Sequence, residues 1–396
     1  MRNNTIDFYQ LIEFGLGGDT WQQFVDRYLE KYEGMVIDGF EFAPPTINYT
    51  WQQLIASTAV TTLPTYVDPE SPGYEKQRGS AKGMSGNIPT QKAFYSLNRT
   101  IVREKMQLVQ RFGQAALDGE MQDVFMNLID ESADGLIKGY YNSLTNQRMQ
   151  VVSTGKFKID ATNNPRGIKD ITFDFGIDAS HFDALAGNNR WWTDADKTKE
   201  GSTSDPIKYM KDRVKLIRNK YHYYGPINIE MCKEMLDALL VHSAVLKRIG
   251  RLLYPLSASD TTGATALQYA QNLDDAAVLA ALSRLVGGGV SLVARDSRAY
   301  VDDWDVATGL LVQKEIDNFS QTNIAFIPSG NIGTIQGVTP ITLGYDPDKV
   351  AYYDSNRLVL TQRANPETNS MYIESEAAQL CVPNMPKYMF ISTVSA

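Results

Sequence analysis

The chain of 396 residues is longer than a single hydrophobic core usually grows, so we expect two or more lobes that share segments of chain. Apolar residues make up 43% and charged residues 21% of the sequence, and no apolar run approaches the ~18 residues of a membrane span, so a membrane partner is not expected. The formal net charge of -8 argues against a protein that works by gripping nucleic acid, which needs a basic surface.

The counts of cysteine and histidine limit the chemistry that the chain can support. Cys232, Cys381, His181, His222 and His242 are too few for a disulfide framework or a clustered metal site, so we expect no metal and no cofactor. The first residues hold no apolar stretch suited to a signal peptide, and we expect synthesis and work in a cytoplasm.

The N-terminal segment resembles an arm that carries one short amphipathic helix, Thr20 to Tyr32. Its apolar residues share one face of the helix: Trp21, Phe24, Val25, Tyr28 and Leu29. A short helix needs a surface on which to bury such a face. Its own domain is the favoured surface, and a neighbouring subunit is the alternative.

Residues 63–92 hold four prolines and four glycines and little that could build a core, which is typical of a functional or disordered loop. The strand-like ends, Val60 to Val67 and Asn87 to Phe94, predict an extended hairpin. Its charges separate along the chain, with acidic Asp68, Glu70 and Glu75 followed by basic Lys76, Arg78, Lys82 and Lys92. Such a finger has no evident partner within its own subunit.

A long amphipathic helix is predicted from Glu120 to Thr154, after a lead-in helical pattern over 97–116. Apolar residues recur at three- and four-residue intervals and define a buried face: Met121, Val124, Phe125, Leu128, Ile129, Ala133, Leu136, Ile137, Tyr140, Tyr141, Leu144, Val151 and Val152. Polar residues define the outer face: Asp123, Asn127, Asp130, Glu131, Asp134 and Lys138. No proline interrupts the stretch, so it could form a strut of roughly 50 Å.

The second half of the chain predicts a strand hairpin, a mixed α/β lobe and an extended tail. Gly155 can end the long helix, and turn formers at 163–167 separate two strands. The expected elements are strands at 156–161 and 168–175, a helix from Asp205 to Tyr223 capped by Ser204, a strand at 227–230, a helix at 233–246, two helices within 261–285, strands at 290–294, 310–312 and 324–327, and an extended tail from 341.

No motif in the sequence predicts catalysis. Cys232 with His222 or His242 could form a thiolate nucleophile, but Cys232 begins an amphipathic helix, where a small buried hydrophobe is the ordinary interpretation. Gly287 to Gly289 precede a strand, so they predict a turn and not a phosphate-binding loop. The chain is therefore not expected to be an enzyme, and an intracellular hydrolase using Cys232 is the rival from a different class.

A basic run lies on the helix that begins near Asp205. Its members are Lys208, Lys211, Arg213, Lys215, Arg218 and Lys220, and on one helix they spread around most of the circumference. A solvated or inter-subunit surface is therefore favoured over a nucleic-acid contact.

The order of segments resembles the major capsid proteins of tailed bacteriophages, which have the Hong Kong 97-type fold. Four stretches look like the subfamily typified by phage lambda's protein E: Leu63–Thr65, Asn87–Thr90, Arg148–Phe157 and Ile327–Gly333. They occur in the order of that family and span roughly residues 40 to 390.

The resemblance implies an α+β, Hong Kong 97-like capsid fold. Its parts are an N-terminal arm at 1–52, an extended E-loop hairpin at 53–97, a P domain at 98–204 with the spine helix 120–154, a mixed α/β A domain at 205–340 and a return to the P domain at 341–396. It implies a virion protein, assembled in the host bacterial cytoplasm, that forms hexamers and pentamers of an icosahedral head.

The implied partners are the chain itself, scaffolding and portal proteins, and packaged double-stranded DNA without sequence-specific contact. Decoration proteins are a further candidate. The net negative charge is compatible with a container, whose inner wall gains from not adhering to DNA. An encapsulin-like compartment shell has the same fold and remains an alternative.

In that family the finger of one subunit lies across the P domain of a neighbour. This predicts inter-subunit contacts from the E-loop residues Tyr66, Asp68, Glu70, Tyr74, Lys76, Arg78, Lys82 and Ile88. The matching residues on the outer face of the spine helix are Asp123, Asp130, Glu131 and Asp134. The basic arm of the finger and the acidic face of the helix are expected to meet.

Overall fold

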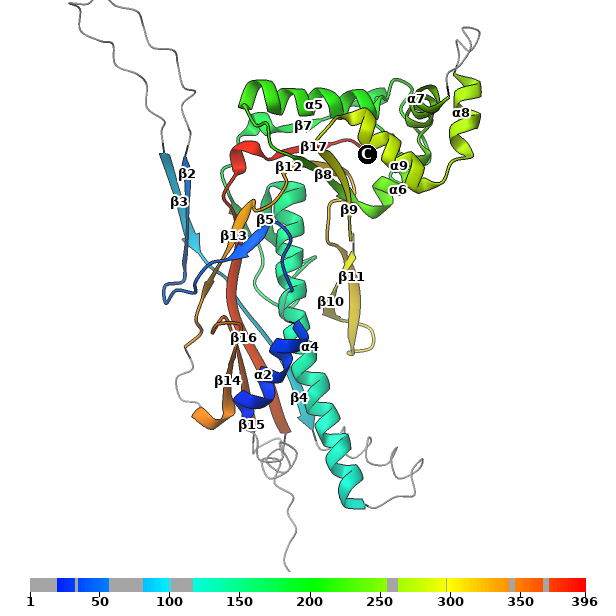
Figure 1. Cartoon of the computed structure of the whole chain (residues 1–396). Coiled ribbons are helices and arrows are strands. Elements are labelled where there is room, and N and C mark those ends of the chain that lie inside the picture. The colour runs from blue at the N-terminus through cyan, green and yellow to red at the C-terminus, as the bar shows by residue number, and fades with distance from the viewer. Residues whose placement is uncertain are drawn as a thin grey trace, which may run out of the picture.

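Helix α4 (Leu117–Thr154) runs through most of the length of the molecule in the computed structural model of the chain (Figure 1). Its 38 residues correspond to about 57 Å at 1.5 Å per residue. The structure describes residues 20–32, 35–56, 81–98, 100, 117–254, 263–296, 298–341, 346–365 and 370–396. The predicted strut is confirmed, and its start lies three residues earlier than expected.

The apolar stripe of α4 is buried as its periodicity predicts. From Ile129 to Val152, every residue assigned to the stripe is buried: Ile129, Ala133, Leu136, Ile137, Tyr140, Tyr141, Leu144, Val151 and Val152. The side chains of Met121, Val124, Phe125 and Leu128 lie outside the described part of the chain. Gly155, with φ +75°, follows the helix, and its amide donates to the Val151 carbonyl at 2.9 Å.

One face of α4 packs against a sheet built around the long strand β16 (Ser370–Pro383). The first part of β16 is flanked on opposite edges by β4 and β15, and its last six residues pair with β13. The remaining strands, β1 and β14, continue the sheet beyond β13 and β15. The strands are β1 (Phe40–Phe42), β4 (Thr90–Asn98), β13 (Gly333–Val338), β14 (Val350–Tyr353) and β15 (Leu358–Asn365).

The N-terminal helix α2 (Trp21–Tyr32) lies on this same sheet. The Trp21 indole is buried and donates to the Leu360 carbonyl at 3.1 Å. The Gln22 side-chain amide exchanges two hydrogen bonds of 2.7 Å with the Tyr352 backbone, much as a further strand would. The helix therefore buries its apolar face on its own chain, as the favoured interpretation predicted.

A second sheet forms the other lobe. Its strand order is β7, β17, β12, β8 and β9, with β12 antiparallel to both of its neighbours. Helix α5 lies above it and α6 to α9 lie to its right in Figure 1, and the C-terminal end of α4 reaches it from below. The strands are β7 (Phe182–Ala184), β8 (Ile227–Cys232), β9 (Val290–Arg295), β12 (Asn323–Pro328) and β17 (Phe390–Thr393).

The helices of this lobe correct two expectations. The expected single helix over 233–246 breaks at His242, whose ψ of 127° is extended, and Asp205 instead of Ser204 caps α5 by accepting from the Lys208 amide at 3.0 Å. The helices are α5 (Pro206–Tyr221), α6 (Lys233–Val241), α7 (Ser243–Leu253), α8 (Ala264–Gln271) and α9 (Asp275–Val286). Short 3₁₀ turns are η1 (Ala179–His181), η2 (Gly187–Asn189), η3 (Pro347–Lys349) and η4 (Pro386–Tyr388).

Three two-stranded ribbons project from these lobes. They are β2 (Thr50–Ala56) with β3 (Ala81–Asn87), β5 (Lys156–Ile159) with β6 (Ile171–Asp174), and β10 (Arg298–Trp304) with β11 (Leu311–Asp317). The ribbon β5–β6 was predicted and is confirmed. The expected finger strand Asn87 to Phe94 was wrong, because the chain divides at Ile88–Pro89 and β4 joins the core sheet. The other expected finger strand, 60–67, lies outside the described residues.

We expect Leu136→Asp to lower the free energy of unfolding by at least about 3 kcal/mol, because it removes a buried side chain and buries an unpaired charge. Urea unfolding of the isolated subunit measures this loss. Asn142→Asp, on the exposed side of the same helix, is the control and should change stability by less than about 0.5 kcal/mol. Equal effects of the two substitutions would contradict the assigned buried face.

Candidate functional site at the joint between the lobes

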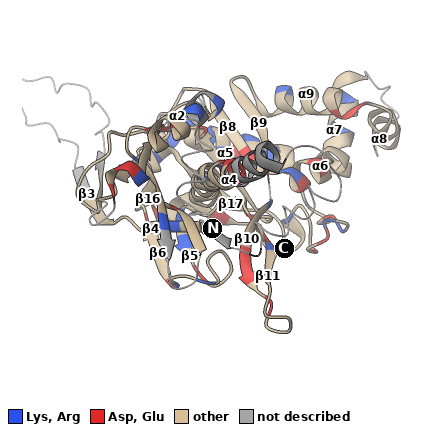
Figure 2. Ribbon diagram, turned by 90° about the horizontal axis from the view of Figure 1, so that it is seen from below, with Lys and Arg blue, Asp and Glu red and all other residues tan. Residues whose placement is uncertain are grey.

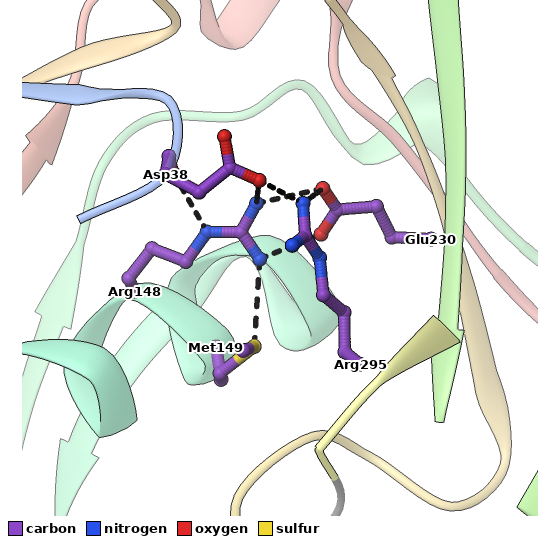
Figure 3. A network of polar contacts seen from close by, with 5 residues as sticks. All are labelled: Asp38, Arg148, Met149, Glu230 and Arg295. Atoms are coloured by element: carbon purple, nitrogen blue, oxygen red, sulfur yellow. Dashed lines mark hydrogen bonds and ion pairs between the residues drawn. The ribbon is translucent and has the colours of Figure 1, made fainter. Parts of the chain in front are cut away.

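A buried ion network joins α4 to the second sheet (Figure 3). The Arg148 guanidinium of α4 donates to both carboxylate oxygens of Glu230 on β8, at 2.6 and 2.7 Å. Arg295 of β9 contacts Glu230 and Asp38, and the Nε of Arg148 donates to the Asp38 carbonyl at 3.0 Å. The network therefore connects four parts of the chain: the segment before β1, α4, β8 and β9.

The central pair of this network is held away from water, whereas the Asp38 side chain is exposed. Side chains of Arg148 and Glu230 are 2% and 0% exposed. Burial alone would raise the pKa of Glu230, but hydrogen bonds and charge from Arg148 and Arg295 outweigh it and hold that pKa below its ordinary value. Removing one partner would leave a buried charge uncompensated, so the network acts as a fixed joint between the lobes.

The sequence carried a signal for Arg148 that the periodicity argument missed. Arg148 lies four residues after Leu144 and four before Val152, so it occupies the buried face of the helix. A charged residue on an apolar stripe requires a buried partner. The positions of Glu230 and Arg295 carried no comparable signal, because only the folded sheet brings β8 and β9 to this end of α4.

The predicted outer face of α4 is divided in the structure. Asp130 and Glu131 are exposed, as expected, and the side chain of Asp123 lies outside the described residues. The expectation that Asp134 faces a neighbouring subunit is corrected. Its side chain is only 19% exposed, and it accepts hydrogen bonds from Lys31 at 2.7 Å and from the Tyr32 hydroxyl and forms an ion pair with Lys138. The docking of α2 on its own chain explains this difference.

Most of the predicted E-loop contact residues lie outside the part of the chain that the structure describes. These are Tyr66, Asp68, Glu70, Tyr74, Lys76 and Arg78, and for Lys82 only the backbone, in β3, is described. The expected inter-subunit contact of Ile88 is corrected, because its side chain is 4% exposed and belongs to the core of its own subunit. Its amide donates to the Tyr49 carbonyl at 2.9 Å, at the point where the ribbon β2–β3 meets the body.

An open groove of about 690 Å³ lies beside α4. Phe94 and Tyr95 of β4, Gly139 of α4 and Ile168 line it, and Asp302 of β10 closes one side. Nearby, the Arg166 guanidinium lies 5.4 Å from the centre of the exposed Trp304 ring on the β10–β11 ribbon. Figure 2 shows acidic residues on β10 and basic residues on β4 and β5 at this end of the molecule. Exposed aromatic and aliphatic side chains around a groove are typical of a protein interaction surface.

The candidate nucleophile Cys232 does not have the surroundings of a reactive thiol. It is buried, its thiol lies 3.3 Å from the Gln321 side-chain oxygen, and burial raises its pKa. A protonated, buried thiol is a poor nucleophile.

A second grouping, Ser204 with His242 and Glu200, has the composition of a catalytic triad but the opposite direction of hydrogen bonding. Burial lowers the pKa of His242, so the ring is neutral. Its Nδ1 accepts from the Ala244 amide at 3.2 Å, so Nε2 carries the proton and donates to Ser204 Oγ at 3.1 Å. A general base must accept from the serine. The group is therefore a cap for α7.

Among the described residues, no group of three or more His, Cys, Asp or Glu side chains is arranged to hold a metal ion. No helix in the same ranges is both long and apolar enough to cross a membrane.

The fold is shared with a solved capsid protein of a prophage. A prophage protein of E. coli CFT073 that is assigned as its capsid protein aligns over 94% of this chain and 98% of its own, with 12% identity and a TM-score of 0.50. The capsid of Ralstonia phage GP4 aligns over 91% and 88%, with 11% identity and a TM-score of 0.46. No curated protein sequence is similar enough to count as a match.

The family is shown by sequence. The family model described as "Phage major capsid protein E" matches residues 38–394, which is most of the chain. The chain therefore belongs to the phage major capsid protein E family, and it is a capsid protein of the phage virion. The expected resemblance and the expected class of fold are confirmed.

We expect Glu230→Gln to destabilise the subunit by about 3 to 5 kcal/mol, because the buried Arg148 guanidinium loses the carboxylate that it binds through two hydrogen bonds, and Arg295 keeps only Asp38. Denaturant unfolding at pH 7 measures the loss. Glu315→Gln breaks an exposed ion pair with Arg298 and should cost less than about 1 kcal/mol.

The effect of Glu230→Gln on stability is expected to depend on pH. The pKa of Glu230 is lowered by folding, so its contribution is present above the unfolded pKa of about 4.3 and is lost as the pH falls through the folded value. The stability difference between the wild type and Glu230→Gln should therefore shrink below about pH 4.3. A stability difference that stays constant down to pH 2 would mean that the contribution of Glu230 to stability does not depend on its charge.

Proposed function

We propose that this chain assembles with itself into hexamers and pentamers of a closed icosahedral head that encloses double-stranded DNA. The observation that carries the proposal is the family match over residues 38–394. The match favours a phage capsid over the encapsulin-like shell. The buried, protonated thiol of Cys232 and the direction of the hydrogen bond between His242 and Ser204 weigh against the hydrolase. Assembly in the host cytoplasm, with scaffolding, portal and decoration proteins as partners, belongs to the same proposal.

We assign the parts of the fold accordingly. The arm takes residues 1–52, the E-loop 53–97, the P domain 98–204 with the return segment 341–396, and the A domain 205–340. The core sheet around β16 unites strands from the arm, the E-loop and the return segment on α4, which supports one P-domain body. Strand β13 joins this sheet from the end of the range assigned to the A domain. The sheet around β12, to which β17 returns near the C-terminus, supports the A domain.

The groove beside α4 and the β10–β11 ribbon supply a surface for contact between subunits. An isolated two-stranded ribbon is marginally stable in water, and this one exposes large apolar side chains: Tyr300, Trp304, Val306, Leu310, Leu311 and Val312. Packing against a neighbouring subunit would bury these side chains and fix the ribbon.

The purified protein should form closed particles of megadalton mass, because each subunit offers the same surfaces to its neighbours. Sizing chromatography followed by negative-stain microscopy measures this. A folded protein that remains a monomer or a small oligomer at all concentrations and salt conditions would contradict the proposed function.

The second experiment tests the contact between the E-loop and the spine helix. Arg78→Glu with Lys82→Glu should weaken assembly, more strongly at low salt, where the reversed charges repel Asp130 and Glu131 of a neighbour with less screening. Each exposed pair contributes only about 0.2 to 1 kcal/mol, but the contact repeats at every subunit.

Compensation is the control for that experiment. Asp130→Lys with Glu131→Lys should partly restore particles in the reversed protein, whereas Asp134 is left unchanged because it holds α2. If the compensated protein assembles no better than the E-loop variant, the two surfaces do not meet.

A further inference from the structure

A row of four basic residues lies along one edge of α5. Lys208, Lys211, Lys215 and Arg218 follow one another at intervals of three, four and three residues, which places them within about 80° of the helix circumference. The helix is fixed by its buried residues Ile207, Met210, Val214 and Ile217. The other two residues of the basic run, Arg213 and Lys220, lie on a different side of the helix. Of these, Arg213 forms an ion pair with Asp183.

The electrostatics of the helix itself are mixed for this row, because Arg218 lies in the last turn, where the helix dipole favours a basic residue, and the N-cap Asp205 lies beside Lys208. Lys208 lies in the first turn, where the helix dipole favours an acidic residue, and that turn has none. Each neighbouring pair in the row places like charges three or four residues apart, which destabilises a helix by about 0.2 to 0.5 kcal/mol. Helix stability alone therefore does not explain why four basic residues share one edge, and this edge offers positive charge to a partner of opposite charge.

The row ends at an exposed glycine loop. Arg218 donates to the Gly288 carbonyl at 2.8 Å, across the turn from Gly287 to Gly289. Gly287 and Gly289 have φ of 141° and 74°, which explains both glycines, but Gly288 has no positive φ and a Cβ built there meets nothing within 4 Å. The fold does not require a glycine at 288. Because Gly288 has no side chain, a large partner can approach the end of the row.

We propose that this row and the adjoining glycine loop bind the phosphate backbone of double-stranded DNA, a proposal that rests on the proposed function as a DNA container. The row is about 15 Å long, and B-DNA carries one phosphate per 1.7 Å of axis, so several phosphates lie within its reach. Asp212, beside Lys208 and Lys215, limits the strength of the grip. In a chain of net charge -8, such a contact holds DNA locally while the rest of the surface repels it.

The first test uses the full-length protein, a fluorescent random-sequence duplex and a titration in KCl. Lys208→Gln with Lys211→Gln and Lys215→Gln should reduce the slope of log affinity against log salt by about 0.9 for each phosphate that the row no longer neutralises. The matched control is Lys92→Gln with Lys156→Gln and Lys158→Gln, which removes the same charge from exposed ion pairs elsewhere. Equal slopes in the two variants would overturn the proposal.

A second pair of variants leaves the lysines untouched. Gly288→Glu should weaken DNA binding several-fold, whereas Gly288→Gln, of nearly the same shape, should weaken it much less, because only the first adds a negative charge at the end of the row. Equal binding by the two would overturn the proposal. With the wild-type protein, DNA should protect Lys208, Lys211 and Lys215 from acetylation and leave Lys156 and Lys158 reactive, a readout that does not depend on the folding of any variant.

Particle formation separates this proposal from the proposed function. The lysine variant should assemble normally under the microscope and lose only its affinity for DNA. If it loses particles while its DNA affinity is unchanged, the row is instead a contact with an acidic face of a second copy. Failure of the wild-type protein to form particles would count against the container, and its DNA titration would still be interpretable.

Discussion

The bidentate pair between Arg148 and Glu230 is the constraint on which the arrangement of the lobes depends. The core sheet around β16 and the sheet around β12 have separate hydrogen-bond ladders, and α4 packs against both. At that junction apolar packing alone would permit sliding, whereas a guanidinium that meets a carboxylate through two directed bonds fixes position and angle. Arg295 and Asp38 then hold the pair from the sheet and from the arm.

The sequence predicted those elements whose physical cause is local. The α4 stripe, the β5–β6 hairpin and the docking of α2 followed from periodicity, turn formers and an unburied apolar face. The break at His242 was not predicted, because the apolar pattern continues through it and only the capping bond to Ala244 reveals the new helix. The expected finger strand from Asn87 to Phe94 was wrong for a similar reason, since nothing within 87–94 distinguishes a strand of a free ribbon from one that joins β16.

Prediction of the site from the sequence was weaker than prediction of the fold. Opposite charges on the finger and on α4 indicated an interface, but the same reasoning could not foresee that Lys31 and Tyr32 would occupy Asp134 from within the chain. The joint itself depends on residues 38, 148, 230 and 295, which no spacing rule connects. Such long-range pairs become visible only once the topology of both sheets is known.

The position of the last strands has a consequence for how the chain reaches its native state. β16 pairs with β4, which lies about 280 residues earlier, as the contact between Lys92 and Glu376 illustrates. β17, only a few residues from the C-terminus, completes the sheet of the other lobe. Neither sheet can close before β16 and β17 have been synthesised, so folding depends on pairing between distant parts of the chain and is expected to be slow. Until then the strands that pair with β16 and β17 have open edges, which expose the incomplete chain to aggregation.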